Sequence, residues 1–215
     1  MEPVATNFPA LSAPVSILLL LGTVALLLLC LTGAAIGALT GRRRAARRLA
    51  LSGVGLAFLY ATALLATGLA MKERTVRPGG GKAFCEIDCH LVYTAESARL
   101  EDLSPGRRLA KIRLIARFDE RTISPTRGNA PLTPNPRDVV LVDAGGRRFA
   151  ARSSDAALTR ALRPGESVTA ELAFEIPQDA TGLRLLVTES DWPTRLLIGH
   201  ENAPLSGKTY LALPG

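Results

Sequence analysis

Two long apolar runs, Val15–Thr40 and Leu49–Met71, constrain this chain more than any other feature, because neither contains a charged residue. At ~1.5 Å rise per residue, helices over these runs would be about 39 and 34 Å long, enough to cross a hydrocarbon core of about 30 Å. A buried core helix or the apolar region of a signal peptide is normally shorter. The sequence therefore predicts two transmembrane helices, at 15–40 and 49–71.

The segment between the runs, residues 41–48, carries five arginines and sets the expected orientation. The positive-inside rule places such a loop in the cytoplasm. The preceding tail, residues 1–14, has Glu2 and no basic residue, whereas four basic residues follow the second run closely. We expect a two-pass protein of the bacterial inner (cytoplasmic) membrane, with the tail and the C-terminal part on the outer, periplasmic or extracellular side.

The remaining charge gives no reason to expect a nucleic acid partner. After the second run the chain has 21 basic and 18 acidic residues, interspersed and without a basic stripe between aromatic residues. Most of the net charge of +7 therefore lies in the loop and is explained by membrane topology.

Small residues recur at steps of four in both runs, which places them on one helical face where a neighbouring backbone can approach closely. We interpret these rows as the packing faces of an antiparallel hairpin, and a homodimer or docking onto a larger membrane complex is the alternative. The residues are Gly33, Gly37 and Gly41 in the first run, and Gly53, Ala57 and Ala61 in the second.

Residues 72–82 include Arg77-Pro-Gly-Gly-Gly81, a composition typical of a flexible tether. From residue 83 onward the apolar period changes from 3.6 to 2, as in Ile112–Phe118 and Val168–Ile176. The alternation places Leu114, Leu172 and Phe174 on the buried face. Residues 83–215 are thus predicted to form an antiparallel β-sandwich, with little helix except a short one at 154–162. Further strands are expected at 84–94, 139–143, 147–152, 183–189, 195–198 and 209–213.

Three motifs of this region resemble a known family. They are Val139-Val-Leu-Val-Asp-Ala-Gly-Gly-Arg-Arg-Phe149, Leu162-Arg-Pro-Gly-Glu166 and Ala173-Phe-Glu-Ile-Pro-Gln-Asp-Ala180. Together they resemble the bacterial telokin-like, immunoglobulin-like domain of unknown function of many surface lipoproteins, over roughly residues 83–213. The resemblance implies that the predicted antiparallel sandwich is an immunoglobulin-like β-sandwich, and it implies no catalytic residues. The chain departs from the pattern by its two-helix anchor and by the cysteines of its first strand.

Those cysteines, Cys85 and Cys89, precede His90 and form the one cluster of reactive residue types. An oxidising compartment favours a disulfide, but in a regular strand their Cα atoms would lie about 13 Å apart, beyond the bridging limit of ~7 Å. A bulge or turn would then be required. Thiolates and imidazole also suit copper, and haem attachment or no special role are the other interpretations.

A second candidate is the proline-rich segment 122–137, which is long for a loop without its own secondary structure. Its prolines would lower the entropy cost of ordering on a partner. It is interpreted as either a recognition loop or a surface crossover. The candidate contact residues are Thr126, Arg127, Asn129, Leu132, Asn135 and Arg137. The single tryptophan, Trp192, is expected to be a core or loop-anchoring residue.

No catalytic triad or phosphate-binding loop can be assembled, since there are only two histidines and Gly79–Gly81 lacks the Lys-Ser/Thr ending. We expect a non-enzymatic membrane protein, without cofactor, that displays its sandwich for protein interaction in the cell envelope. Its partners would be the lipid bilayer and a protein, and a homodimer is possible. The alternative is a copper-binding or redox accessory of a respiratory membrane complex that uses Cys85, Cys89 and His90.

Overall fold

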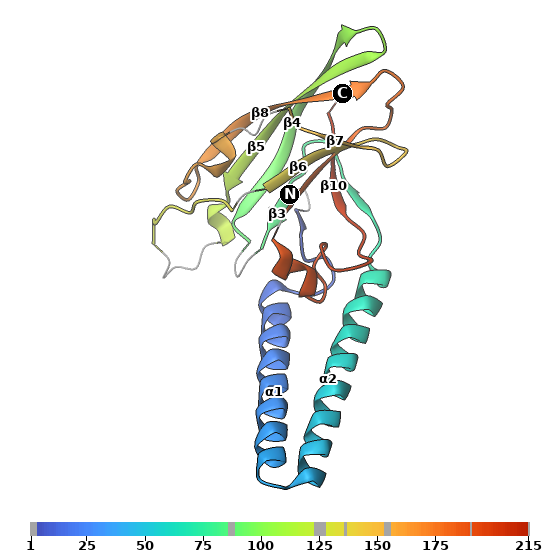
Figure 1. Cartoon of the computed structure of the whole chain (residues 1–215). Helices are drawn as coiled ribbons and strands as arrows, with labels where there is room; N and C mark the ends of the chain where they lie inside the picture. Colours follow the sequence, from blue (N-terminus) through green and yellow to red (C-terminus); the bar gives the residue numbers. More distant parts are fainter. Residues whose placement is uncertain are drawn as a thin grey trace.

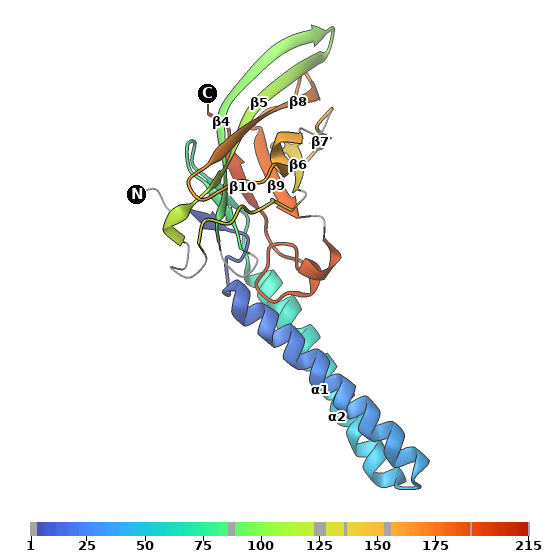
Figure 2. The ribbon, with the colours of Figure 1, turned by 90° about the vertical axis from the view of Figure 1, so that its left-hand side faces the viewer.

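A helical hairpin and a two-sheet sandwich make up the fold (Figures 1 and 2). The computed structural model describes residues 4–85, 89–122, 128–135, 137–152, 156–189 and 191–214. The two helices run side by side from the sandwich to a tight turn at the opposite end of the molecule.

The helices α1 (Ala13–Leu39) and α2 (Arg43–Ala70) are long and apolar enough to cross a membrane, judged by length and composition. They are joined by Thr40, Gly41 and Arg42, and Gly41 has a φ of +77°, a value that glycine adopts without a steric cost. Because α2 begins at Arg43, four of the five arginines lie in its first turns. The predicted loop over 41–48 was therefore too long.

Small residues mediate the helix packing, but only some of those predicted. A Cβ added to Gly37 would lie 3.3 Å from Ala46, and one added to Gly53 would lie 3.3 Å from the Cβ of Cys30. Gly33 lies against Leu49.

Gly41, Ala57 and Ala61 are exposed and lie outside this packing face, so their assignment to the packing of the hairpin was wrong, and their role in a homodimer or in docking onto a larger complex stays a prediction. Steps of four drift around a helix of 3.6 residues per turn. The face that α2 buries instead combines one step of three with two steps of four, through Gly53, Leu56, Tyr60 and Leu64.

Two five-stranded sheets form the sandwich. The first sheet has the order β1 (Ala5–Thr6), β3 (Lys82–Phe84), β4 (Leu91–Ser104), β5 (Arg107–Phe118) and β8 (Ser167–Pro177). The second has the order β2 (Arg74–Val76), β10 (Thr209–Ala212), β9 (Arg184–Glu189), β6 (Arg137–Val142) and β7 (Arg148–Ala150). Pairing is antiparallel except between β1 and β3 and between β2 and β10.

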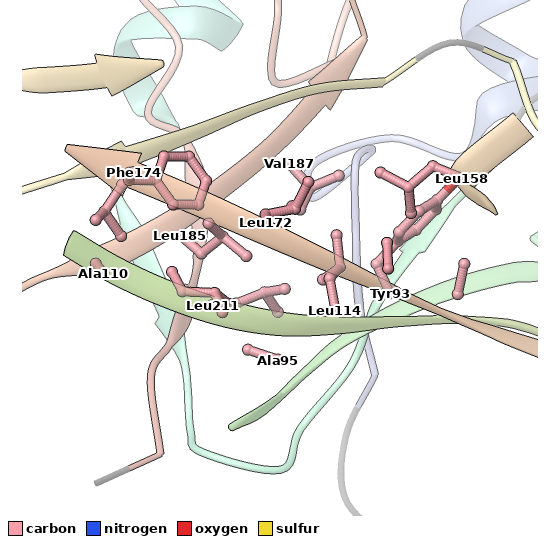
Figure 3. Close-up of a cluster of buried hydrophobic side chains, with 14 of the residues drawn as sticks. Tyr93, Ala95, Ala110, Leu114, Leu158, Leu172, Phe174, Leu185, Val187 and Leu211 are labelled. Atoms are coloured by element: carbon pink, nitrogen blue, oxygen red, sulfur yellow. The ribbon is translucent and has the colours of Figure 1, made fainter. Parts of the chain in front are cut away.

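The core lies between the sheets and follows the predicted alternation (Figure 3). Leu114, Leu172 and Phe174 are buried, as predicted, against Leu185 and Leu211 of the second sheet. The alternate residues Arg113 and Glu171 point to the solvent and form an exposed ion pair. A period of two thus places every second side chain of β5 and β8 in the core.

The tail and the linker differ from the predictions, because both contribute strands. Residues of the tail form β1, where the amide of Ala5 donates to the carbonyl of Gly81 (3.0 Å). The predicted tether contributes β2 and the first residue of β3. The segments on both sides of the helical hairpin are therefore built into the sandwich, and the linker is not a free tether.

Three smaller predictions were also wrong. The strand expected at 195–198 is replaced by the 3₁₀ helix η3 (Trp192–Leu196), and the helix expected at 154–162 reduces to the 3₁₀ helix η2 (Ala156–Thr159) within the described residues. The strand expected at 84–94 is divided between β3 and β4, and β4 continues to Ser104. A further 3₁₀ turn, η1 (Glu120–Thr122), follows β5.

Candidate functional site

Cys85 and Cys89 form a disulfide directly after β3, with their Cα atoms 4.0 Å apart. Because β3 ends at Phe84 and the two Cα atoms lie this close, Cys85 and Cys89 do not belong to one extended strand. This short distance removes the geometric objection that an extended strand raised against a bridge. The bond occupies both sulfur atoms, so the thiolate ligands of the copper hypothesis are absent from this arrangement.

His90 does not face a metal site in the described part of the chain. Its ring is buried and lies 5.3 Å from the ring of Phe118, while its carbonyl accepts a hydrogen bond from the amide of Asp119 (2.7 Å). Within the described residues, no three His, Cys, Asp or Glu side chains are arranged to hold a metal ion.

Asn7 connects the disulfide to the tail. Its Oδ1 accepts the amide of Cys85 (2.8 Å), and its Nδ2 donates to the carbonyl of the same residue (3.4 Å). The carbonyl of Asn7 also accepts the amide of Glu201 (2.9 Å). This fully buried amide therefore joins the chain before α1 to β3 and to the segment that follows β9.

Beside Asn7, Lys82 and Glu201 form an ion pair with a distance of 2.6 Å between Nζ and Oε1, and both side chains are fully buried. Lys82 also donates to the carbonyls of Val187 (2.6 Å) and Thr209 (3.0 Å), so each ammonium proton has an acceptor. Burial lowers the pKa of Lys82, and the charge of Glu201 opposes this change.

Glu189 forms the second half of this buried cluster. One carboxylate oxygen accepts from Arg137 (3.0 Å) and the other contacts Nε2 of His200 (3.0 Å). Burial opposes the ionisation of Glu189, but the hydrogen bond from His200 and the charge of Arg137 outweigh it, so its pKa lies below the ordinary value. The guanidinium of Arg137 also lies over the ring of Phe84, 4.4 Å from its centroid.

We call this group the buried charge cluster; it consists of Asn7, Lys82, Arg137, Glu189, His200 and Glu201. Its two carboxylates are balanced by the lysine and the arginine, and its side chains are closed to solvent. Buried charges of this kind are tolerated only when they are paired. The cluster therefore fixes β1, β3, β6 and β9 and the following segment relative to one another, and it offers a substrate no access.

The sequence did not predict this cluster, because its members come from five separate parts of the chain. Lys82 and Glu201 are 119 residues apart in sequence. The one local signal is the position of Lys82, a charged residue at the start of a strand whose other residues are apolar.

The predicted recognition loop is only partly a surface feature. Thr126 and Arg127 lie outside the described residues, whereas Asn129 and Asn135 are exposed. Leu132 forms a β-bridge with Leu162 and packs on the core, and the side chain of Arg137 is buried in the charge cluster. Arg137 was therefore wrongly assigned as a partner contact, because tertiary packing covers its side chain, whereas Leu132 is only half-buried and its contact role stays a prediction.

A surface that the sequence did not predict lies at the end of the sandwich opposite the helices, where β4 and β5 extend as a hairpin (Figure 1). β4 pairs with β5 along nearly its whole length but with β3 only at Leu91–Tyr93. Among the described residues, no strand pairs with the other edge of β4 from Thr94 onward. Pro105-Gly106 at the turn, where Gly106 has a φ of +78°, is the signal that could have revealed this hairpin.

The hairpin carries exposed apolar residues beside a cleft. Leu100 and Leu103 are 49% and 43% exposed. A cleft of about 590 Å³ lies beneath the hairpin, lined mainly by apolar groups that include Ala98, Leu100, Leu183 and Leu213. Arg108 closes one side by donating to the carbonyls of Gln178 (2.6 Å) and Ala180 (3.0 Å). We call the hairpin tip and this cleft the distal surface.

Comparison with known proteins gives a family match over part of the chain. Residues 126–195 match the model of a domain of unknown function, DUF4352. No curated protein matches the chain. An uncharacterized β-sandwich protein from Clostridium difficile aligns with 11% identity and a TM-score of 0.38, over 67% of this chain and 96% of that one.

Two further solved structures align. The secreted protein MPT63 from Mycobacterium tuberculosis has 9% identity and a TM-score of 0.41, over 65% of this chain and 97% of its own. An ApaG protein from Pseudomonas aeruginosa has 18% identity and a TM-score of 0.28, over 44% of this chain and 90% of its own. The assignment of the sandwich rests on the strand pairings of the chain itself, and part of that sandwich matches a domain of unknown function.

Proposed function

We propose that this chain is a non-enzymatic, two-pass protein of the bacterial inner membrane that presents an immunoglobulin-like, telokin-like sandwich on the outer side to a protein partner. The partner would bind the distal surface. The observation that carries this proposal is the unpaired edge of β4 next to the apolar cleft. An exposed strand edge can accept an extended segment of another chain through backbone hydrogen bonds, and neighbouring pockets give specificity.

The charge pattern of β4 supports a heterologous partner. Glu96, Arg99, Glu101 and Asp102 interrupt the edge with charge, and the pairing with β5 shifts register between Ala95 and Ser97 and between Asp102 and Ser104. Charges and bulges discourage the pairing of identical edges, which would otherwise lead to aggregation. They leave the edge available to a complementary segment.

The part of the sandwich nearest the helices also supports this proposal, because it holds the sandwich, and with it the distal surface, in a fixed position. The buried charge cluster and the strands β1 and β2 attach the sandwich to both helices. A partner that binds the tip would thus meet a surface at a fixed height above the membrane. The ionisable groups of the buried charge cluster are paired with one another and closed to solvent, which supports a structural role for the cluster at the base of a binding domain.

The test is site-specific photocrosslinking in native membranes, with a crosslinking residue in place of Leu100 or Leu103. We expect one discrete adduct from each position, and we expect Arg108→Ala, which removes one wall of the cleft, to weaken it. The matched control is a crosslinker at Glu171, which is exposed on β8, at the other side of β5 from the unpaired edge of β4. The same adducts from the control position, or none from the hairpin, would contradict the proposal.

A further inference from the structure

The segment between β9 and β10 packs against the ends of both helices nearest the sandwich. Ser16 of α1 donates to the carbonyl of Ile198 (2.6 Å), and Tyr60 of α2 donates to the carbonyl of Leu196 (2.7 Å). Leu64, Ile198 and Ala203 form a small apolar cluster there. Figures 1 and 2 show η3 and the following loop next to the upper turns of the helices.

The charges of α2 fix the depth of this segment relative to a bilayer. The last arginine of α2 is Arg48, and the twenty residues from Leu49 to Gly68 span about 30 Å, the thickness of a hydrocarbon core. With Arg48 at the inner boundary, Gly68 lies at the outer one. Tyr60 then lies about 12 Å deeper in the membrane than Gly68. Because the hydroxyl of Tyr60 contacts Leu196, residues 191–206 reach down to the boundary between headgroups and acyl chains.

Large apolar side chains of this segment are exposed, beside the exposed charges of Asp191 and Arg195. Trp192 is 69% exposed, Leu205 is 62% exposed and Leu196 is 38% exposed. Leu205 also has a φ of +65°, which is uncommon for a residue with a side chain. Tryptophan is enriched where proteins meet the membrane interface, because its ring is apolar and its N–H can reach a polar partner.

We propose that residues 191–206 form an interfacial lipid-binding segment, with Trp192, Leu196 and Leu205 embedded among the headgroups and upper acyl chains of the outer leaflet. The occupant of this apolar surface is phospholipid, because the segment continues the lipid-facing surface of two membrane helices. This proposal rests on the proposed membrane topology. It adds a third membrane contact that would prevent the sandwich from tilting relative to the helices.

The chain contains one tryptophan, so its fluorescence reports this segment alone. The full chain would be reconstituted in phospholipid nanodiscs whose acyl chains carry bromine either near the headgroup or near the terminal methyl. We expect emission at shorter wavelength than that of a tryptophan amide in water. We also expect roughly twofold or stronger quenching by shallow bromine than by deep bromine, and weak quenching by aqueous acrylamide.

Two substitutions sharpen the test. Leu196→Asp should move the emission toward that of the free amide, since it places a charge among the lipids beside Trp192. The control is Leu100→Asp, an exposed leucine at the distal hairpin, which should leave the emission unchanged. Equal effects of both substitutions would overturn the proposal.

The outcomes separate this inference from the proposed function. If the chain resists extraction by alkaline carbonate but Trp192 is quenched fully by acrylamide, the lipid contact is refuted and the two-pass topology stands. If carbonate extracts the chain, the topology itself fails. Protection of Trp192 from both quenchers, lost on dilution of the protein in the membrane, would assign the surface to a second copy and refute lipid as its occupant.

Discussion

At the residue scale, we expect the sandwich to be sensitive to changes in the fully buried pair of Lys82 and Glu201. Lys82→Met leaves the Glu201 carboxylate buried without its partner, which should lower the free energy of unfolding by about 3 to 5 kcal/mol. The double variant with Glu201→Gln should lose less, because no unpaired charge remains. The measurement is chemical unfolding of the full chain in detergent.

The exposed pair of Arg113 and Glu171 provides the control for this prediction. Their side chains are 3.8 Å apart at the surface, where water and salt screen the interaction. Glu171→Gln should leave the unfolding midpoint unchanged. Equal losses in the two pairs would show that burial does not decide the contribution of Lys82.

Asp119 gives a prediction for pH. A hydrogen bond from Arg121 lowers the pKa of Asp119 from 3.8 to about 2, despite opposing burial. Because the folded-state pKa is depressed, the stabilisation is complete above pH 4 and is lost as the pH falls through 2. Asp119→Asn should therefore lower the free energy of unfolding by about 1 kcal/mol at neutral pH, a modest value because Arg121 is half exposed.

The difference between this variant and the native chain should shrink as the pH falls from 4 to 2, measured by thermal unfolding across that range. A difference that stays constant down to pH 2 would show that the ionisation of Asp119 is not the source of the stabilisation.

At the element scale, the contact between α2 and the segment before β10 depends on a glycine. A Cβ added to Gly68 would collide with the carbonyl oxygen of Pro204. Gly68→Ala should therefore separate the helix from the segment, lower the unfolding free energy by about 1 to 3 kcal/mol and speed proteolysis within residues 191–206. At Gly55, where an added Cβ meets no atom within 4 Å, alanine should be neutral or slightly stabilising.

The disulfide that follows β3 gives a second prediction at this scale. The non-reduced chain should be two hydrogens lighter than the reduced chain, and this difference should vanish in the Cys85→Ser, Cys89→Ser variant. Loss of such a short covalent loop should lower the unfolding free energy by about 2 kcal/mol. Cys30→Ala should keep the mass difference, since Cys30 is a free cysteine of α1. Two free thiols in the native chain would return copper to consideration.

At the scale of the whole molecule, both ends of the helical hairpin enter one sandwich, so they must lie on the same side of any membrane that the helices cross. Alkaline phosphatase fused after Gly215 should be active, and a fluorescent protein that folds only in the cytoplasm should stay dark there. This expectation follows from the arginines near the turn between α1 and α2. The opposite pattern would reverse the orientation and remove the oxidising environment of the disulfide.

The sequence by itself determined the features that repeat locally. The two apolar runs predicted α1 and α2, and the alternation in 112–118 and 168–176 predicted β5 and β8 with Leu114, Leu172 and Phe174 inside. These predictions succeeded because helical and strand periods are carried by neighbouring residues. The bounds of α2 were missed because arginine is a good helix former and its helix extends beyond the apolar run.

Only the tertiary structure decided the role of the short segments. Strands of two or three residues, such as β1 and β2, show no period, and their partners lie more than 70 residues away. Lys82 became a core residue because Glu201 compensates its charge, and Arg137 became one because Glu189 does. A buried charge is stable only when folding supplies its partner, so its location depends on long-range packing that no local pattern of the sequence contains.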